Sequence, residues 1–342
     1  MFSFHRAAVA GLASLVLAGC ATAPNNKPMS AQVASAIQPV DLRIGIKQSE
    51  VYAAFEPSMG GASAAAACGA VPGLGILLAA ACGGALGAVD ATVNASRAKT
   101  ADEIVRPLKD ETVDAKFDQL LTDAIGKSLQ GIPKFQVSGT TLTKTVDPKA
   151  YEETFRASTA SAVMFVNVDY HVSPDFSTLQ VTARGLVYPR SSAARTAAGL
   201  AAELPAPGKD PVLAPNTAAY HVDVAYHAKL PVQATAPADY VAAWKADNAR
   251  LLRAGMNDGA AQVGRLLAED LQRAPDSQRT VIRKAEPAKG LPGDLLAESN
   301  GGQLMLMPGG MLVFKTTLSK DAGTASAAVP TATSAAGTVA AQ

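Results

Sequence analysis

Aromatic residues, cysteines and net charge are all scarce in this sequence. Phe, Trp and Tyr make up 5% of the 342 residues, while 48% of the residues are hydrophobic, many of them alanine. A core built mainly from alanine and aliphatic side chains is therefore expected. The 30 lysines and arginines are balanced by 29 aspartates and glutamates, which gives a formal net charge of +1. The chain has no strongly basic field of the kind that attracts nucleic acid, and we expect no nucleic-acid partner.

The sequence motifs of common enzyme classes are also missing. The chain has no Gly-x-Ser-x-Gly turn, no phosphate-binding loop and no His-Glu-x-x-His pair. After Cys20 the only histidines are His171, His221 and His227, and none lies beside a residue that it would activate as a nucleophile. We therefore expect a non-enzymatic protein that needs no cofactor.

The clearest motif lies near the N-terminus, where Leu17-Ala18-Gly19-Cys20 closes a short apolar segment. The apolar residues follow a weakly basic start, and small residues precede the cysteine, as in a secretory signal. The segment is too short to span a bilayer. These residues resemble the signal of bacterial lipoproteins.

This resemblance implies that residues 1–19 are a signal peptide and that Cys20 becomes an acylated N-terminal residue. Several acyl chains hold a protein on a membrane almost permanently, so Cys20 would be an anchor and neither a catalytic thiol nor half of a disulfide. In lipoproteins an Asp after the cysteine favours the inner membrane, whereas this chain has Ala21. The expected location is the periplasmic face of the outer membrane. The alternative is an ordinary secreted protein whose signal happens to end in Cys.

Both ends of the mature chain have the composition of flexible segments. Residues 20–39 include Pro24 and Pro28 and have no apolar periodicity, so a flexible tether is expected. Residues 321–342 consist mostly of Ala, Thr, Ser, Gly and Val. Because they offer no large apolar side chain to bury, a disordered tail is expected.

A second unusual segment, residues 59–89, contains no charged side chain and is rich in Ala and Gly. Four of its glycines recur at four-residue spacing, which lets another helix approach closely; they are Gly69, Gly73, Gly83 and Gly87. Three structures fit this pattern: a small-residue helix or hairpin packed on the domain or on a partner, a second contact with the membrane, and a loop.

The remaining two cysteines, Cys68 and Cys82, lie within this apolar segment. A disulfide between them suits an oxidising compartment and would close a short loop around Pro72. If the segment is one continuous helix, the two thiols lie too far apart to bond. Both outcomes stay open at the level of sequence.

Hydrophobic periodicity beyond the apolar segment predicts an α+β domain, with helices covering a small, mainly antiparallel sheet. Trp244 is expected as a core anchor of the longest helix. The predicted helices span residues 102–129, 148–157 and 238–273, the predicted strands span 162–172, 178–188 and 218–230, and a long loop spans 189–215. The expected organisation is an extended stretch plus the apolar segment over 40–101, the α+β domain over 102–290 and a β-hairpin extension over 291–320.

Five polar residues mark one face of the expected sheet. His221, Asp223 and His227 alternate along one strand, as Asp169 and His171 do along another. Imidazoles and carboxylates can bind a divalent metal. However, His221 and His227 would lie about 20 Å apart along an ideal strand. We therefore expect a solvated polar face and no metal site.

The order of elements over residues 102–273, together with the lipoprotein signal, resembles the auxiliary lipoproteins of ABC-type transport and the curli secretion lipoprotein family. That resemblance implies an accessory or structural component of a cell-envelope or transport assembly, with an envelope protein or a second copy as partner. It assigns a role to no residue. The alternative is a membrane-active or oligomer-forming lipoprotein in which residues 59–89 insert in the bilayer or line a multimer.

Overall fold

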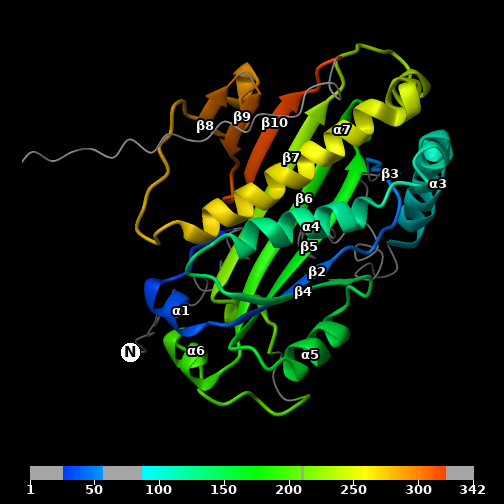
Figure 1. The fold of residues 1–342 in the computed structure, drawn as a ribbon. Coiled ribbons are helices and arrows are strands. Elements are labelled where there is room, and N and C mark those ends of the chain that lie inside the picture. Colours follow the sequence, from blue (N-terminus) through cyan, green and yellow to red (C-terminus); the bar gives the residue numbers. More distant parts are fainter. Residues whose placement is uncertain (1–25, 57–86, 209–211, 300, 321–342) are drawn as a thin grey trace, which may run out of the picture.

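A computed structural model describes residues 26–56, 87–208, 212–299 and 301–320, with residues 87–93 described by their backbone alone. Among these residues ten strands form one sheet (Figure 1). Its main path is β4-β2-β5-β6-β7-β10-β9-β8, while β1 pairs with β7 and β3 pairs with β5. The strands are β1 (Asn26–Lys27), β2 (Val40–Gly45), β3 (Tyr52–Ala53), β4 (Val137–Thr143), β5 (Ala162–Val172), β6 (Thr178–Pro189), β7 (Tyr220–Lys229), β8 (Asp294–Ser299), β9 (Gly302–Leu306) and β10 (Leu312–Thr317).

The centre of the sheet is formed by the three long strands β5, β6 and β7. They are antiparallel and in continuous register, so that Val166 lies opposite Gly185, which in turn lies opposite Val222. Each strand has the apolar character and turn-rich flanks that predicted it. All three predicted strands are found within two residues of the expected bounds.

The architecture is α+β, as expected, but the sheet is large and mixed. β2 pairs in parallel with β4 and β5, and β10 pairs in parallel with β7. The hairpin over residues 291–320 is therefore no separate extension, since β9 and β10 continue the main sheet. Parallel partners are joined by long crossovers, so no local pattern in the sequence indicates them.

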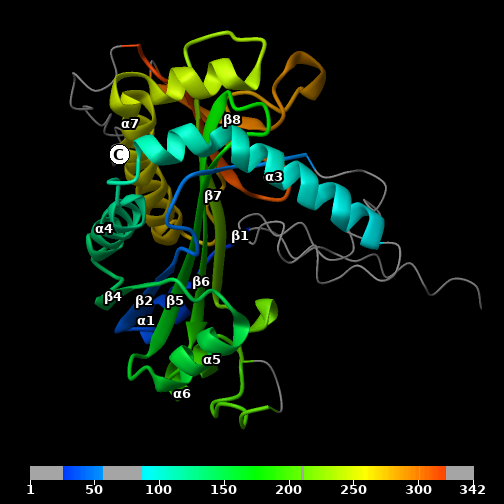
Figure 2. The same ribbon diagram turned by 90° about the vertical axis from the view of Figure 1, so that its right-hand side faces the viewer.

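Helices cover both faces of the sheet (Figure 2). Gly259 of α7 approaches Val181 on one face, whereas Phe155 of α5 packs with Phe165 on the other. Among the described residues no helix combines the length and apolar character needed to cross a bilayer. The α-helices are α1 (Ala31–Ala36), α3 (Gly87–Glu111), α4 (Phe117–Gln130), α5 (Pro148–Ala157), α6 (Ser192–Ala197) and α7 (Pro237–Gln272).

Helix α7 has an apolar stripe along one side. Its backbone is also interrupted at a point that the hydrophobic pattern does not predict. The Trp244 side chain is fully buried, and its Nε1 donates a hydrogen bond of 2.8 Å to the Phe176 carbonyl. Shortly after it, Asp247, Asn248 and Ala249 have positive φ angles of 55°, 58° and 53°. Asp and Asn are among the residues that tolerate this region best. The helix predicted over 238–273 is therefore two helical pieces around a break.

The helix predicted over residues 102–129 is also two helices, α3 and α4. The chain leaves the helical path after Glu111, where the Thr112 hydroxyl donates to the Leu108 carbonyl at 2.9 Å. Val113, which would lie within a continuous helix over 102–129, is instead in the break between the two helices and is 81% exposed. The predicted loop over 189–215 differs too, because it contains α6.

The flexible tether predicted over residues 20–39 is wrong from Asn26 onward. β1 pairs antiparallel with β7, and Ser30 caps α1 by accepting a hydrogen bond from the Val33 amide at 3.2 Å. Val33 and Ile37 are buried in the main core. Their four-residue spacing forms the apolar face of a helix of only six residues, which is too short to produce a clear periodic signal.

Small residues let α7 lie close to the sheet. A Cβ atom added to Gly259 would meet Tyr226 Cδ1 at 2.8 Å and Val181 Cγ2 at 3.0 Å. One helical turn earlier, the same atom added to Gly255 would meet Leu179 Cδ2 at 3.0 Å. In a chain with few aromatic residues, this close approach fills the space between helix and sheet.

Replacing Gly259 with Ala is expected to destabilise the domain. Overpacking a tight core costs about 1–3 kcal/mol, whereas the better helix propensity of Ala returns at most about 1 kcal/mol. Urea unfolding followed by circular dichroism would measure the change. Gly139→Ala is the control, because a Cβ atom there meets nothing within 4 Å. A Gly259→Ala protein at least as stable as the wild type would contradict the close approach.

Candidate functional site

The polar residues predicted from the sequence do lie on one face of the sheet, the face away from α7. At its centre is Asp169 on β5, whose side chain is only 12% exposed. Its carboxylate accepts hydrogen bonds from the Tyr52 hydroxyl at 2.8 and 2.9 Å, and from Gln48 Nε2 at 3.2 Å. His171 Nδ1 lies 2.6 Å from the same carboxylate. Burial, together with the charge of Asp169, raises the pKa of Tyr52, so this hydroxyl stays protonated and donates.

A row of polar side chains crosses the sheet from this centre. Tyr52 pairs with His171, His171 with Gln180, Gln180 with His227, and His227 with Lys315, each pair being opposite in register. His171 Nε2 is 3.1 Å from Gln180 Oε1, so its ring is bonded on both sides. The row therefore connects five strands of the sheet side by side.

His227 is held in its neutral form within this row. Burial, followed by the positive charges of Lys315 and His171, lowers the pKa of His227 from its ordinary 6.5 to about 4. A neutral imidazole is a potential metal ligand or base. It has no carboxylate opposite it in register, because its neighbours are Gln180 and Lys315.

Asp223 belongs to a second polar group on the same face. Arg184 grips its carboxylate with two hydrogen bonds of 2.7 and 2.8 Å, and His221 Nε2 lies 3.4 Å from one oxygen. Burial, the largest single influence, opposes ionisation of Asp223, but the hydrogen bonds and charges of Arg184 and His221 together outweigh it and lower the pKa of the carboxyl. Asp223 thus remains a charged partner of Arg184.

The polar side chains of this face hold neighbouring strands together through hydrogen bonds and ion pairs. The oxygens of Asp169 and Asp223 already accept from Tyr52, Gln48 or Arg184. His221 and His227 stand six positions apart on β7, about 20 Å along the strand. No group of three or more His, Cys, Asp or Glu side chains able to hold a metal occurs in the described part of the chain. The five predicted residues therefore form two separate polar groups.

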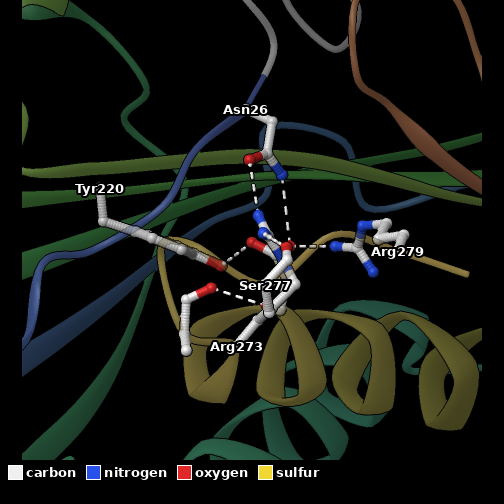
Figure 3. A network of polar contacts seen from close by, with 7 residues as sticks. Asn26, Tyr220, Arg273, Ser277 and Arg279 are labelled. Carbon is white, nitrogen blue, oxygen red and sulfur yellow. Dashed lines mark hydrogen bonds and ion pairs between the residues drawn. The ribbon is translucent and has the colours of Figure 1, made fainter.

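A buried acid at the end of α7 forms a different polar centre, which Figure 3 shows. The Asp270 side chain is fully buried, and Tyr220, which is also fully buried, donates its hydroxyl to Oδ2 at 2.9 Å. Oδ1 accepts from Asn26 Nδ2 at 3.2 Å and from Arg273 Nε at 3.3 Å, and it also pairs with Arg279. We call these five residues the Asp270 clamp.

The Asp270 clamp ties the first described residues of the chain to the domain. Arg273 reaches back to Asn26 Oδ1 at 3.1 Å, so Asn26 bonds both the acid and one of its arginines. The neighbouring Lys27 donates to the Ala218 carbonyl, just before β7 begins. The chain is thereby fixed to the domain six residues after Cys20.

A cleft of about 520 Å³ lies elsewhere on the domain, between α3, the end of β3 and the β5–β6 turn. Its lining combines charged side chains with the rings of Phe55 and Phe176. Arg97 from α3 donates to the Glu56 carbonyl at 2.7 Å across it. Glu56, which lines the cleft, is the last described residue before residues 57–86.

Six of the residues singled out from the sequence lie outside the described residues. These are Cys20, the Cys68 and Cys82 pair, and the glycines Gly69, Gly73 and Gly83. Gly87 is the first residue of α3, and its backbone alone is described.

No predicted site residue belongs to the Asp270 clamp, although one signal for the clamp exists in the sequence. Asp270 falls on the apolar stripe of α7, three positions after Leu267 and next to Leu271. A single acid at a core position of an amphipathic helix indicates a buried polar partner. Its partners Asn26 and Arg279 come from distant or irregular segments, and no pattern indicates them.

Comparison with protein-family models, with curated proteins and with solved structures found no match. The function must therefore be argued from the chain's own residues. Two features bear on it, namely the sequence Leu17-Ala18-Gly19-Cys20 and the Asp270 clamp that begins at Asn26.

Replacing Asp270 with Asn is expected to lower the free energy of unfolding by about 3 kcal/mol, because breaking a buried ion pair leaves its partners uncompensated. Arg273 and Arg279, 17% and 20% exposed, would lose their counter-charge. Glu269→Gln is the matched control, since Glu269 is the adjacent acid but is 47% exposed in its pair with Arg265. Such exposed pairs contribute about 0.5 kcal/mol or less. Equal effects in urea unfolding would contradict the role of the clamp.

His227 is expected to make the domain less stable as the pH falls from 6.5 towards 4. Over this interval the unfolded chain takes up a proton that the folded chain resists, so the contribution is present above pH 6.5 and is lost below it. The loss is at most about 3 kcal/mol. His227→Gln should flatten the pH dependence of urea unfolding over this interval and leave stability above it nearly unchanged. Parallel curves for variant and wild type would contradict the assignment.

Proposed function

We propose that the protein is a non-enzymatic lipoprotein, anchored through Cys20 to the periplasmic face of the outer membrane, which serves as an accessory or structural component of a cell-envelope or transport assembly. The observation that carries this proposal is the short spacing between the anchor and the domain. Only residues 21–25 separate Cys20 from β1, which pairs with β7. A domain built in this way is held close to the membrane surface.

The arrangement of the polar side chains supports a scaffold. The carboxylates of Asp169, Asp223 and Asp270 each accept two or more hydrogen bonds, and their donors join different strands or helices. Buried carboxylates that are satisfied in this way make a fold rigid and specific. A rigid domain suits a protein that presents a binding surface at a fixed place.

The proposed partner is an envelope protein or a second copy of the chain, and the region around residues 59–89 is the proposed contact. The cleft beside Glu56 and Arg97 adjoins this segment and offers both charged and aromatic groups. The competing function places residues 59–89 in the bilayer. The two functions differ in what holds the protein on the membrane when Cys20 is changed.

A Cys20→Ala variant tests the anchor. It should lose the acyl mass that the wild-type protein carries and move from the membrane fraction to the soluble periplasmic fraction, because the acyl chains supply the anchoring energy. Mass spectrometry and fractionation of cells would measure both changes. Cys68→Ala is the matched control and should keep both the acyl mass and the membrane location.

The outcomes separate the two functions. A wild-type protein without acyl mass would overturn the proposed anchor. A Cys20→Ala protein that lacks acyl chains and still resists extraction by high salt or alkali would favour insertion of residues 59–89 in the bilayer.

A further inference from the structure

The start of the domain lies close to the proposed lipidation site. Six residue steps separate Cys20 from Asn26, and a fully extended chain of that length spans about 20 Å. Asn26 is fixed, since β1 pairs with β7 and its side chain bonds Asp270. Strand β6 alone has 12 residues and is about 40 Å long. Because the tether is shorter than the domain, the domain cannot turn freely, and the edge that carries Asn26 must face the bilayer.

The same edge carries an irregular stretch that joins α7 to β8, which we call the basic connector (residues 273–289). It has five basic side chains and two acidic ones, in a chain whose net charge is +1. Its basic residues are Arg273, Arg279, Arg283, Lys284 and Lys289. Positive charge is therefore concentrated beside the point where the tether enters the domain.

The Asp270 clamp fixes the basic connector next to the tether. Arg273 bonds Asn26 directly, and Arg279 pairs with Asp270, which Asn26 also bonds (Figure 3). Ile282 follows Arg279 by three residues, a span of at most about 10 Å. The middle of the connector therefore lies about as close to Asn26 as the lipid on Cys20 does.

The exposed residues of the connector suit a lipid surface. Ile282 is 62% exposed, and in the described ranges only Val113 is another large hydrophobic residue that is mostly exposed. Lys284 and Lys289 are 78% and 79% exposed, and each pairs with a carboxylate at the surface. Exposed pairs of this kind are weak and exchange readily with other charges. Basic side chains around an exposed aliphatic one favour contact with anionic headgroups at a membrane interface.

We infer that the basic connector rests on the surface of the membrane that holds Cys20, with Arg283, Lys284 and Lys289 among anionic phospholipid headgroups and Ile282 at the interface. The inference rests on the proposed lipidation of Cys20. It adds an orientation to the anchor: the β8 side of the sheet faces the bilayer, and the β4 side faces away.

Tryptophan quenching in vesicles tests this orientation. The lipidated full-length protein is reconstituted in vesicles of phosphatidylglycerol and phosphatidylcholine, with and without acyl chains brominated near the glycerol. Ile282→Trp is compared with Val113→Trp, a matched exposed site at the junction of α3 and α4. The buried Trp244 gives the same background in both proteins.

The Ile282→Trp protein should lose most of its added fluorescence in brominated vesicles, and the Val113→Trp protein should lose none beyond the wild type. Equal quenching of both, or quenching at Val113→Trp alone, would overturn the orientation. The orientation would also be overturned if a protein whose mass shows the acyl chains gave no quenching. In that case the proposed anchor would still stand. A protein without acyl mass would instead overturn the proposed function itself.

Lengthening the tether provides the second arm of the test. A flexible Gly/Ser insertion after Ala23, longer than the domain, should reduce quenching at Ile282→Trp while leaving the acyl mass and the membrane fraction unchanged. If quenching persists with the long tether but disappears at high salt, the connector binds anionic headgroups on its own charge, which also supports the contact. If neither the longer tether nor high salt reduces quenching, then neither the short tether nor the basic side chains hold the connector at the membrane, and the inference is overturned.

Discussion

The attachment of the first described strand to the rest of the domain depends on one buried carboxylate. Asp270 lies at the end of α7, where removing a charge from water costs several kcal/mol unless donors surround it. Its donors come from the first strand, from the start of β7 through Tyr220, and from the chain that follows α7 through Arg279. Three stretches far apart in sequence, at residues 26, 220 and 270–279, therefore share one fixed point. Without that point β1 would be held by its pairing with β7 and by the Lys27 contact with the Ala218 carbonyl.

The two faces of the sheet are held together in different ways. On the α7 face, the glycines of the helix bring its backbone close to Val181 and Tyr226, so small side chains replace the bulky aromatic residues that the composition lacks. On the other face, hydrogen bonds join neighbouring strands through Asp169 and Asp223. Both arrangements fix the strands in register, and both make the sheet rigid. Rigidity of this kind is what lets a clamp at one corner orient the whole domain.

Local patterns predicted the parts of this fold that depend on local sequence. Strand β5 and helix α5 have the predicted bounds, because alternation and a proline-led helical start are visible within a few residues. The parallel pairing of β2 with β5 was not predictable, since it joins residues more than a hundred positions apart. The polar face was predicted as a set of residues, yet Tyr52 and Arg184, which pair with its acids, come from a short strand and from the neighbouring strand. The clamp was not predicted because its residues meet only in the tertiary structure. Among them only Asp270 interrupts a recognisable sequence pattern, the apolar stripe of α7.

The basic connector also lies along one edge of the sheet. An open edge strand presents unpaired backbone groups that attract other strands. On the β8 side, the Ile282 amide donates to the Leu295 carbonyl at 2.8 Å, so the basic connector covers that edge. On the other side, β4 ends the path of the sheet among the described residues. If the connector faces the bilayer, the membrane and the connector together shield the β8 edge. The β4 edge, which ends the sheet among the described residues, then lies seven strand spacings, or about 34 Å, from β8 and faces away from the membrane.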